Sequence, residues 1–397
     1  MAEGPPVIIF GAHIAALGVL RVLTRHGVTC YVADDTSDII SRSRWRRALE
    51  PTLAETTDSA IVAGYLEGLA VPSAVIIACS DRWSLGLSGI PHSLRQRFPS
   101  SLPERNAIEQ FVDKDKFRAL VERLGIPHPR AIPLRTVDDL DLATDAELTS
   151  GFLKPTDSPR HKVHFHTKGA FVDSRESASR IVERGAKVGI EFMLQEWIPG
   201  PMGATILIDG FFDRTGTIVA MLARRRIRMN PPRIGNTVSA VTIPLEEVEE
   251  PIGALRRLFA DVGYRGVFNA EFKRDERDGT YKIIEINARP AWFIGTIASI
   301  GVDLPWMNYL DAQDLPVPAP PPYRAGRYTL YELQDAAAMI RSVRSRRRPL
   351  GPILGPWLRG DRAMFWWRDP GPAIGGAGRA VGRRVLGAFG RARPTAS

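Results

Sequence analysis

The chain has 397 residues, 44% of them hydrophobic and 24% charged, which excludes a disordered protein and allows two or three domains with sizeable cores. Two widely separated cysteines, Cys30 and Cys79, exclude a disulfide framework and favour a reducing compartment. The formal net charge is +9, but the sequence contains no nucleic-acid-binding motif. With no signal peptide pattern and no long apolar run, we expect a cytoplasmic protein.

The N-terminal segment alternates short apolar runs with a helical pattern. From Val7 to Ala33 it predicts a strand, a turn at Gly11, a helix that ends before Gly27, and a second strand. Asp34 or Asp35 would then suit the ribose of a dinucleotide in an oxidoreductase. Alanine and histidine follow Gly11, however, where the G-x-G-x-x-G fingerprint needs its second glycine, so we disfavour that alternative.

A later apolar run, within Val75 to Trp83, predicts another buried strand of the same sheet. Asp81 follows it at the carboxyl end, the edge where such sheets bind ligands. Asp81 is therefore a candidate substrate-binding residue. The same position would equally suit the N-cap of a helix.

Three arginines alternate in the run ARRRIRM, so Arg224, Arg226 and Arg228 share one face of a predicted strand. Two interpretations stay open. The arginines could form an ordinary solvated face, or they could clamp an acyl phosphate or an acidic substrate, since guanidinium binds both through paired hydrogen bonds.

Two alternating runs, FNAEFKRD and YKIIEINARPAW, flank the turn signal Asp278-Gly279 and predict an antiparallel hairpin. Glu271 and Glu285 share a face if odd positions pair with odd positions. Carboxylate and amide oxygens suit magnesium that also holds phosphate oxygens, so the hairpin indicates a nucleotide substrate. The polar positions of its two strands are Asn269, Glu271, Lys273, Glu285, Asn287 and Arg289.

The motif E-x-N-x-R-P at the end of this hairpin, with a glutamate on the partner strand, resembles the metal-binding core of the ATP-grasp superfamily of carboxylate–amine ligases. Three more segments match pieces of that superfamily in the same order: KDKFRALVERLGIPHP from Lys114, GFLKP from Gly151 and LQEWIPGP from Leu194. Over roughly Val7 to Pro305, the chain looks most like the D-aspartate-ligase-like branch.

The resemblance implies a role for each matching residue. The implied ATP-binding residues are Lys114, Lys154, Lys168, Glu196, Trp197 and Ile198. The implied ligands of Mg²⁺, or of Mn²⁺ in its place, are Glu271, Glu285 and Asn287. The implied catalytic residues are Arg289 and Arg226, and the candidates for contact with the substrates are Asp81, Arg224 and Arg228.

The segment from Pro155 to Ala170 takes the place of the superfamily's phosphate-covering loop, but it has one glycine, Gly169, where many relatives have several. Whether its backbone or the side chains of Lys162 and Lys168 hold phosphate stays open. Zinc is disfavoured because the histidines of the run lack a cysteine or carboxylate partner there. These histidines are His161, His164 and His166.

The implied fold class is α/β, in the α+β arrangement of ATP-grasp proteins. We expect a Rossmann-like domain over residues 1–110, a small subdomain with the lid loop over 111–195, a metal and substrate subdomain over 196–325, and a C-terminal extension over 326–397. ATP would be gripped between the two subdomains.

The positive charge is concentrated in the C-terminal extension. From Arg341 onward there are 13 arginines and two aspartates, a net charge of 13 − 2 = +11, which leaves 9 − 11 = −2 for the rest. This tail could pack on the body, stay solvated, or contact an anionic membrane or nucleic acid.

The resemblance implies a ligase that joins a small-molecule acid to an amine through an acyl phosphate and releases ADP and phosphate. A carboxylase or carbamoyl-phosphate-type enzyme, or a non-catalytic nucleotide-binding relative, is the alternative. No specific nucleic-acid partner is expected, and the chain could form a homodimer. The sequence does not identify the acid or the amine.

Overall fold

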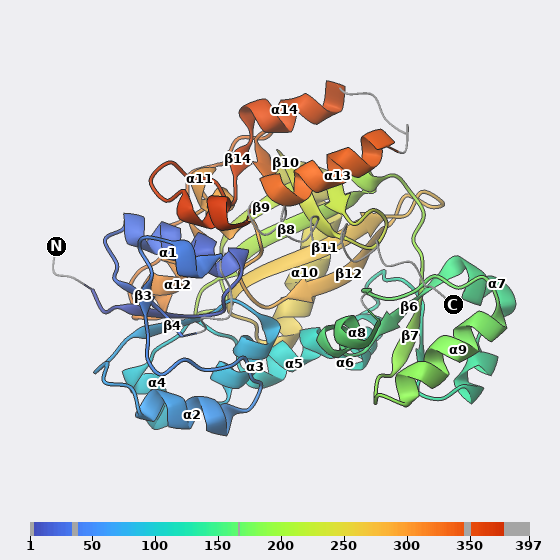
Figure 1. Cartoon of the computed structure of the whole chain (residues 1–397), viewed down its shortest axis with the longest axis horizontal. Helices are drawn as coiled ribbons and strands as arrows, with labels where there is room; N and C mark the ends of the chain where they lie inside the picture. Colours follow the sequence, from blue (N-terminus) through green and yellow to red (C-terminus); the bar gives the residue numbers. More distant parts are fainter. Residues whose placement is uncertain (1–3, 34–38, 166, 345–350, 377–397) are drawn as a thin grey trace, which may run out of the picture.

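The computed structural model describes residues 4–33, 39–165, 167–344 and 351–376. Three sheets organise this part of the chain (Figure 1). Asp34 and Asp35, the ribose-contact candidates of the oxidoreductase alternative, lie outside the described residues. Within the described ranges, no helix combines the length and the apolar character that crossing a membrane requires.

The first sheet is parallel, with strand order β3-β2-β1-β4, and lies within residues 1–110. Its strands β1 and β4 are apolar and fully buried, as expected when helices cover both faces of a parallel sheet. The strands are β1 (Val7–Phe10), β2 (Cys30–Val32), β3 (Arg47–Ala48) and β4 (Val75–Ala78). The helices are α1 (Ile14–Arg25), α2 (Ser59–Glu67), α3 (Asp81–Ser88), α4 (His92–Arg97) and α5 (Arg105–Val112).

The second sheet is small and antiparallel, with strand order β5-β7-β6. Two of its helices begin with capping boxes, in which Thr144 and Ser174 satisfy free backbone N–H groups. The strands are β5 (Ala131–Leu134), β6 (Gly151–Pro155) and β7 (Phe192–Glu196). The helices of this part are α6 (Lys114–Arg123), α7 (Asp145–Ser150), α8 (Ser158–Phe165) and α9 (Arg175–Ala186).

The third sheet has the order β12-β11-β8-β9-β10-β13-β14, and α10 (Glu249–Val262) packs its apolar side on one face. Its last two strands come from the segment expected as a separate C-terminal extension, so this segment completes the sheet. The strands are β8 (Thr205–Phe212), β9 (Ile218–Asn230), β10 (Asn236–Ile243), β11 (Gly266–Arg274), β12 (Tyr281–Asn287), β13 (Tyr328–Leu330) and β14 (Asp361–Arg362). Helices α13 (Glu332–Arg344) and α14 (Gly351–Arg359) flank β13 and β14 along the chain.

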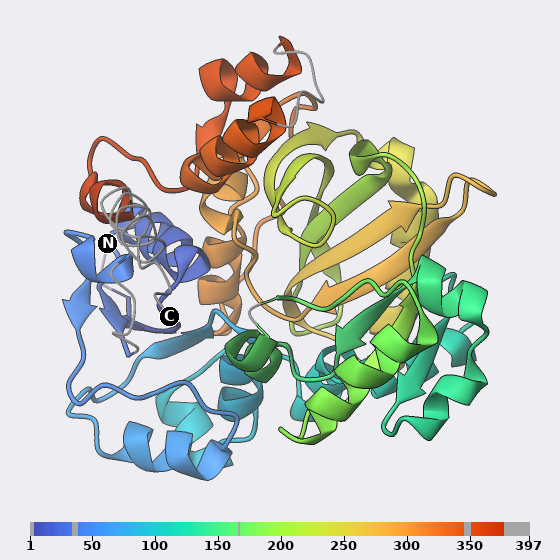
Figure 2. The same cartoon turned by 45° about the vertical axis from the view of Figure 1, so that its right-hand side comes forward.

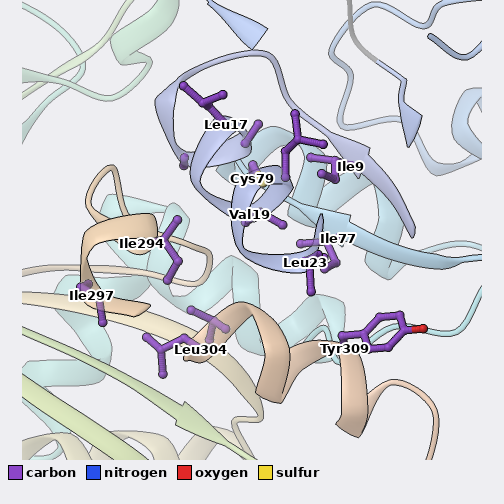
Figure 3. Packing of buried hydrophobic residues seen from close by; sticks show 14 of the residues in the cluster. Ile9, Leu17, Val19, Leu23, Ile77, Cys79, Ile294, Ile297, Leu304 and Tyr309 are labelled. Atoms are coloured by element: carbon purple, nitrogen blue, oxygen red, sulfur yellow. The ribbon is translucent and has the colours of Figure 1, made fainter. Parts of the chain in front are cut away.

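The N-terminal domain and the large sheet share one hydrophobic core. Helix α1 packs against α11 (Ile294–Ser299) and α12 (Leu304–Asp311), and residues from β1, β4 and all three helices are buried together (Figure 3). Gly18 on α1 and Gly295 on α11 lie in close contact. A Cβ atom added at Gly18 would lie 2.7 Å from Ile294 Cγ2 and 2.8 Å from the backbone nitrogen of Gly295. Glycine is therefore required for this contact between helices.

The C-terminal segment folds back onto the N-terminal domain, beside α1 (Figure 2). Arg21 on α1 donates from Nε to Asp369 Oδ2 at 3.0 Å, and both side chains are buried. Ser43 Oγ donates to the same carboxylate at 2.8 Å, and Arg21 also donates to the carbonyl oxygen of Met364 at 2.9 Å. The tail thus packs on the body at least as far as Asp369. Its more distal arginines lie outside the described residues.

We expect Gly18→Ala to lower the free energy of unfolding by about 2 kcal/mol, because the added methyl group overpacks the contact between α1 and α11. Gly64→Ala is the matched control, since Gly64 lies on an exposed helix surface where an added Cβ atom meets nothing within 4 Å. The control should raise stability by about 0.5 to 1 kcal/mol through helix propensity. Urea unfolding of both variants measures the difference, and equal effects would contradict the close packing.

Candidate functional site

A cavity of about 760 Å³ opens between the small and the large sheets. This volume is within the range of ligand-binding pockets, about 300 to 1,000 Å³. Every predicted site residue lines the cavity except Lys114 and Arg228. Those that line it are Asp81, Lys154, Lys168, Glu196, Trp197, Ile198, Arg224, Arg226, Glu271, Glu285, Asn287 and Arg289.

Strands β11 and β12 form the predicted antiparallel hairpin, and its register brings the two glutamates together. Glu271 pairs with Glu285 and Asn269 pairs with Asn287, so the two carboxylates lie side by side on the cavity face. A register shift follows at once between Glu271 and Phe272. Odd positions therefore meet odd positions where the proposed metal ligands lie, which is the condition under which Glu271 and Glu285 share a face.

A chain of side-chain hydrogen bonds crosses the large sheet along this face. Asp209 on β8 accepts from Arg224 Nη2 at 2.7 Å through one carboxylate oxygen and from Asn269 Nδ2 at 2.8 Å through the other. The Oδ1 atom of Asn269 then accepts from Asn287 Nδ2 at 3.3 Å. Because Asp209, Arg224 and Asn269 are buried, this chain compensates charges that water cannot reach.

Arg289 extends the chain from the large sheet to the N-terminal domain. Its Nη2 atom donates to Asn287 Oδ1 at 2.8 Å, and its Nε atom donates to Asp81 Oδ1 at 2.9 Å. Burial alone would lower the pKa of Arg289, but the adjoining Asp81 carboxylate raises it above its ordinary value. The N-cap interpretation of Asp81 is wrong, because the side chain of Ser80 caps α3 and leaves the Asp81 carboxylate to hold Arg289.

The three alternating arginines share a face but each has its own carboxylate. Arg226 Nη2 lies 2.6 Å from Glu271 Oε2, and its Nε donates to Thr237 Oγ1 at 2.7 Å. Arg228 lies beyond the cavity, where its Nη2 atom is 2.7 Å from Asp335 Oδ2 on α13. All three arginine side chains are buried, so a solvated strand face is wrong. Arg228 has a structural partner instead of a place in the cavity.

The predicted lysines lie at different depths. Lys154 on β6 and Lys168 line the cavity, and Lys168 Nζ donates to Asn236 on β10. Lys114 lies behind them and donates from Nζ to the carbonyl oxygen of Thr156 at 2.6 Å. Burial, together with the nearby charge of Lys154, lowers the pKa of Lys114 to about 8.

The lid segment gives no support for zinc. His161 is buried and stacks on Phe165, with ring centroids 4.4 Å apart, and its Nδ1 atom lies 3.0 Å from the carbonyl oxygen of Thr167. Of the residues whose placement is described, no three or more His, Cys, Asp or Glu side chains gather closely enough to hold a metal ion. The side chains of Lys162 and His166 lie outside the described set.

The proposed Mg²⁺ ligands form a set of two carboxylates and one amide. The loss of surrounding water alone would raise the pKa of Glu285. The positive charges of Lys154, Lys168 and Arg289 outweigh this effect and lower the pKa below its ordinary value. Glu285 therefore stays ionised at neutral pH. Two carboxylates fit Mg²⁺, which binds few protein ligands and keeps water and phosphate oxygens for the others.

The segment 196–201, at the end of β7, lines part of the cavity and is called the hinge below. The Glu196 carboxylate accepts from the backbone N–H of Arg130 at 3.1 Å and lies 3.3 Å from Lys282 Nζ, while it also pairs with Arg277. The carbonyl oxygen of Ile198 accepts from Lys273 Nζ at 2.7 Å. These contacts fix the hinge backbone against the β11–β12 hairpin.

An aromatic group next to the hinge was not predicted from the sequence. The Trp197 ring centroid lies 4.9 Å from that of Phe171 and 6.3 Å from that of Phe152. Arg233, in the turn between β9 and β10, has φ of 76° and places its guanidinium 4.1 Å from the Phe171 ring centroid. The turn has no motif that would have marked it. Asp209 did have a signal, as the one charge in the apolar run TILIDGFF.

No family model matches the chain. The D-aspartate ligase of Enterococcus faecium (strain Aus0004) is 27% identical over 225 residues, which are 54% of this chain and 53% of that protein. The C-terminal section of the carbamoyl phosphate synthase large chain of Methanopyrus kandleri (strain AV19) is 24% identical over 230 residues, 53% of this chain and 41% of that protein. The chain thus spans about half the length of these curated relatives, or less.

Solved structures match more of the chain at lower identity. An ADP complex of N5-carboxyaminoimidazole ribonucleotide synthetase has a TM-score of 0.62 at 13% identity, with 87% of each chain covered. The L-amino acid ligase from Bacillus licheniformis has a TM-score of 0.58 at 13% identity, with 79% of this chain and 75% of that chain covered. The carboxyaminoimidazole ribonucleotide synthase from Aspergillus clavatus, complexed with ATP, has a TM-score of 0.61 at 14% identity, with 80% of this chain and 79% of that chain covered.

These neighbours share the ATP-grasp fold, and the chain has that fold, as the sequence predicts. The sequence similarities to D-aspartate ligase and to the carbamoyl phosphate synthase section each cover about half the chain.

The lowered pKa of Lys114 predicts a specific dependence of stability on pH. Between about 8 and its ordinary value of 10.5, the folded state has released this proton and the unfolded state has not. Stability should therefore rise with pH across this window, by up to about 1 kcal/mol per pH unit, relative to Lys114→Met. Urea unfolding of both proteins at several pH values tests this. Lys116→Met, at an exposed position on the same helix, is the control that should parallel the wild type.

Proposed function

We propose that the chain is an ATP-dependent carboxylate–amine ligase. A substrate carboxylate attacks the γ-phosphate of ATP to give an acyl phosphate and ADP. An amine then attacks the acyl carbon, an amide forms, and phosphate leaves. The observation that carries the proposal is the pair Glu271 and Glu285, side by side in a cavity that Lys154 and Lys168 also line. The similarity to D-aspartate ligase supports it.

The cavity offers distinct surroundings for the parts of ATP. The apolar side chains at the hinge, Phe152, Trp197 and Ile198, suit the flat face of a base. Lys154 and Lys168 suit the phosphates, because they are cationic and line the same cavity. Two structural neighbours were solved with ATP or ADP, which supports a nucleotide here.

Glu271, Glu285 and Asn287 would hold Mg²⁺, which would neutralise the phosphate charge when bound. Mn²⁺ could replace it, since carboxylate and amide oxygens suit both ions. Arg226 donates a hydrogen bond to one oxygen of Glu271 and so keeps that carboxylate oriented toward the cavity. Phosphoryl transfer needs positioning and charge stabilisation more than covalent chemistry, and these side chains can supply both.

Arg289 would stabilise the transferring phosphoryl group or the acyl phosphate. Asp81 and Asn287 hold its guanidinium from two sides, so its orientation is fixed before the substrates arrive. Such preorganisation costs no rearrangement during the reaction. Asp81 thereby acts as a positioning residue, in place of the direct substrate contact considered from the sequence.

A second candidate is a carboxylating or carbamoyl-phosphate-forming enzyme with bicarbonate as the acid. The match to a carbamoyl phosphate synthase section favours keeping it. Phosphate release from ATP, measured with bicarbonate and with a panel of amino acids and small acids, alone and with amines, separates the two. Stimulation by an organic acid supports the ligase, and stimulation by bicarbonate alone supports the alternative.

Glu285→Gln should reduce ATP turnover at least about a hundredfold without unfolding the protein, because a neutral amide is a poor ligand for Mg²⁺ at this position. The control is Glu276→Gln, an exposed glutamate in the turn of the same hairpin. Phosphate release and the melting temperature are measured for both. Wild-type turnover of Glu285→Gln would rule out the metal assignment.

Arg289→Lys should lower kcat at least about tenfold, with a smaller change in the KM for ATP, because lysine keeps the charge but loses the fork. The contrasting role is purely structural, as a link between Asp81 and the sheet. In that case kcat would stay constant while the melting temperature fell. Steady-state kinetics and thermal unfolding of the same variant distinguish these outcomes.

A further inference from the structure

Aromatic and basic side chains gather where the C-terminal segment meets the N-terminal domain. Figure 2 shows this segment, in red, beside α1. The Trp45 and Trp366 rings lie 4.6 Å apart, and the Phe365 and Trp367 rings lie 4.8 Å apart. We call this surface the tryptophan–arginine patch. Its residues are Arg25, Arg44, Trp45, Phe365, Trp366, Trp367 and Arg368.

Cations accompany these rings. The Arg25 guanidinium lies 4.3 Å from the Trp366 ring centroid, and Arg44 lies 6.0 Å from that of Trp45. Arg25, Arg44 and Arg368 are all exposed. The patch therefore presents three positive charges to water, and those of Arg25 and Arg44 are within reach of an aromatic ring.

Two large apolar side chains of the C-terminal segment are left in water. Trp367 is 84% exposed and Ile374, seven residues further on, is 65% exposed. Leaving a tryptophan in water forfeits the free energy of burial, about 2 to 3 kcal/mol for a large apolar side chain. Large exposed apolar groups with a polar rim mark interaction sites.

The patch is held on a rigid base. Next to Trp367, the Asp369 carboxylate is buried against Arg21 and Ser43, and Met364 is fully buried on the other side. Because Asp369 is buried and paired, it does not offset the exposed arginines. The exposure of Trp367 is thus imposed by its anchored neighbours.

We propose that the tryptophan–arginine patch binds the surface of a membrane that contains anionic phospholipids. Tryptophan favours the boundary between lipid headgroups and acyl chains, and arginine pairs with headgroup phosphates. Single-stranded nucleic acid would also attract arginines and aromatic rings. An exposed tryptophan and a separate exposed isoleucine favour an apolar boundary over stacked bases. The strongly basic sequence that follows adds attraction to any anionic surface.

The test is cosedimentation of the full chain with vesicles of phosphatidylcholine, with or without phosphatidylglycerol. We expect binding only with phosphatidylglycerol, and weaker binding at high salt. Trp367→Ala and the double variant Arg25→Gln, Arg44→Gln should each lower the partition coefficient about fivefold or more. The matched control is Leu142→Ala, which alters a side chain 62% exposed in the small subdomain and should bind like the wild type.

Equal binding by the patch variants and the control would overturn the proposal, because the basic tail alone would then explain the attraction. Absence of binding to both kinds of vesicle would overturn it as well. Two further measurements identify other occupants. If the wild type binds a single-stranded oligonucleotide but no vesicles, and the patch variants lose the oligonucleotide binding, the patch would be assigned to nucleic acid. Conversion of a dimer to a monomer by Trp367→Ala, seen by light scattering, would assign it to a second copy of the chain.

Discussion

Compensation of buried charge is the constraint that organises this molecule around its cavity. Asp209 lies in the middle of a fully buried strand, where an unpaired carboxylate would be prohibitively costly. Arg224 and Asn269 supply its partners from the two neighbouring strands, and the chain continues through Asn287 to Arg289. The cavity face is polar because each of these side chains needs a hydrogen-bond partner, and the next side chain of the chain supplies it.

The same chain couples two parts of the protein that are distant in sequence. Arg289 ends it at Asp81, 208 residues earlier, at the start of α3 in the N-terminal domain. Removing Asp81 would leave the Arg289 charge without its carboxylate partner, and removing Arg224 would leave the Asp209 charge without its guanidinium partner. The position of the N-terminal domain and the orientation of the proposed catalytic arginine therefore depend on each other. The effects of substitutions at Asp81 and at Arg289 on the free energy of unfolding should not be additive.

Local pattern predicted the elements around the site well. Alternation within two short runs, with Asp278-Gly279 between them, predicted the hairpin that carries Glu271 and Glu285, and the structure then defined its register. Partners that come from far along the chain were not predictable in this way. Nothing near Arg228 indicates Asp335, and nothing near Arg226 indicates that the strand face with the arginines is buried, because burial depends on how distant elements pack. The aromatic group at the hinge was missed for the same reason, since Phe171 and Trp197 meet only in the folded chain.

The pair of Arg21 and Asp369 has a consequence for the order of events during synthesis. Arg21 emerges from the ribosome 348 residues before the carboxylate that compensates its charge. An N-terminal domain that folds as it emerges must keep the C-terminal half of α1 hydrated until Asp369 has been synthesised. This contact can therefore close only after β13 and β14, the last two strands of the large sheet, have been synthesised.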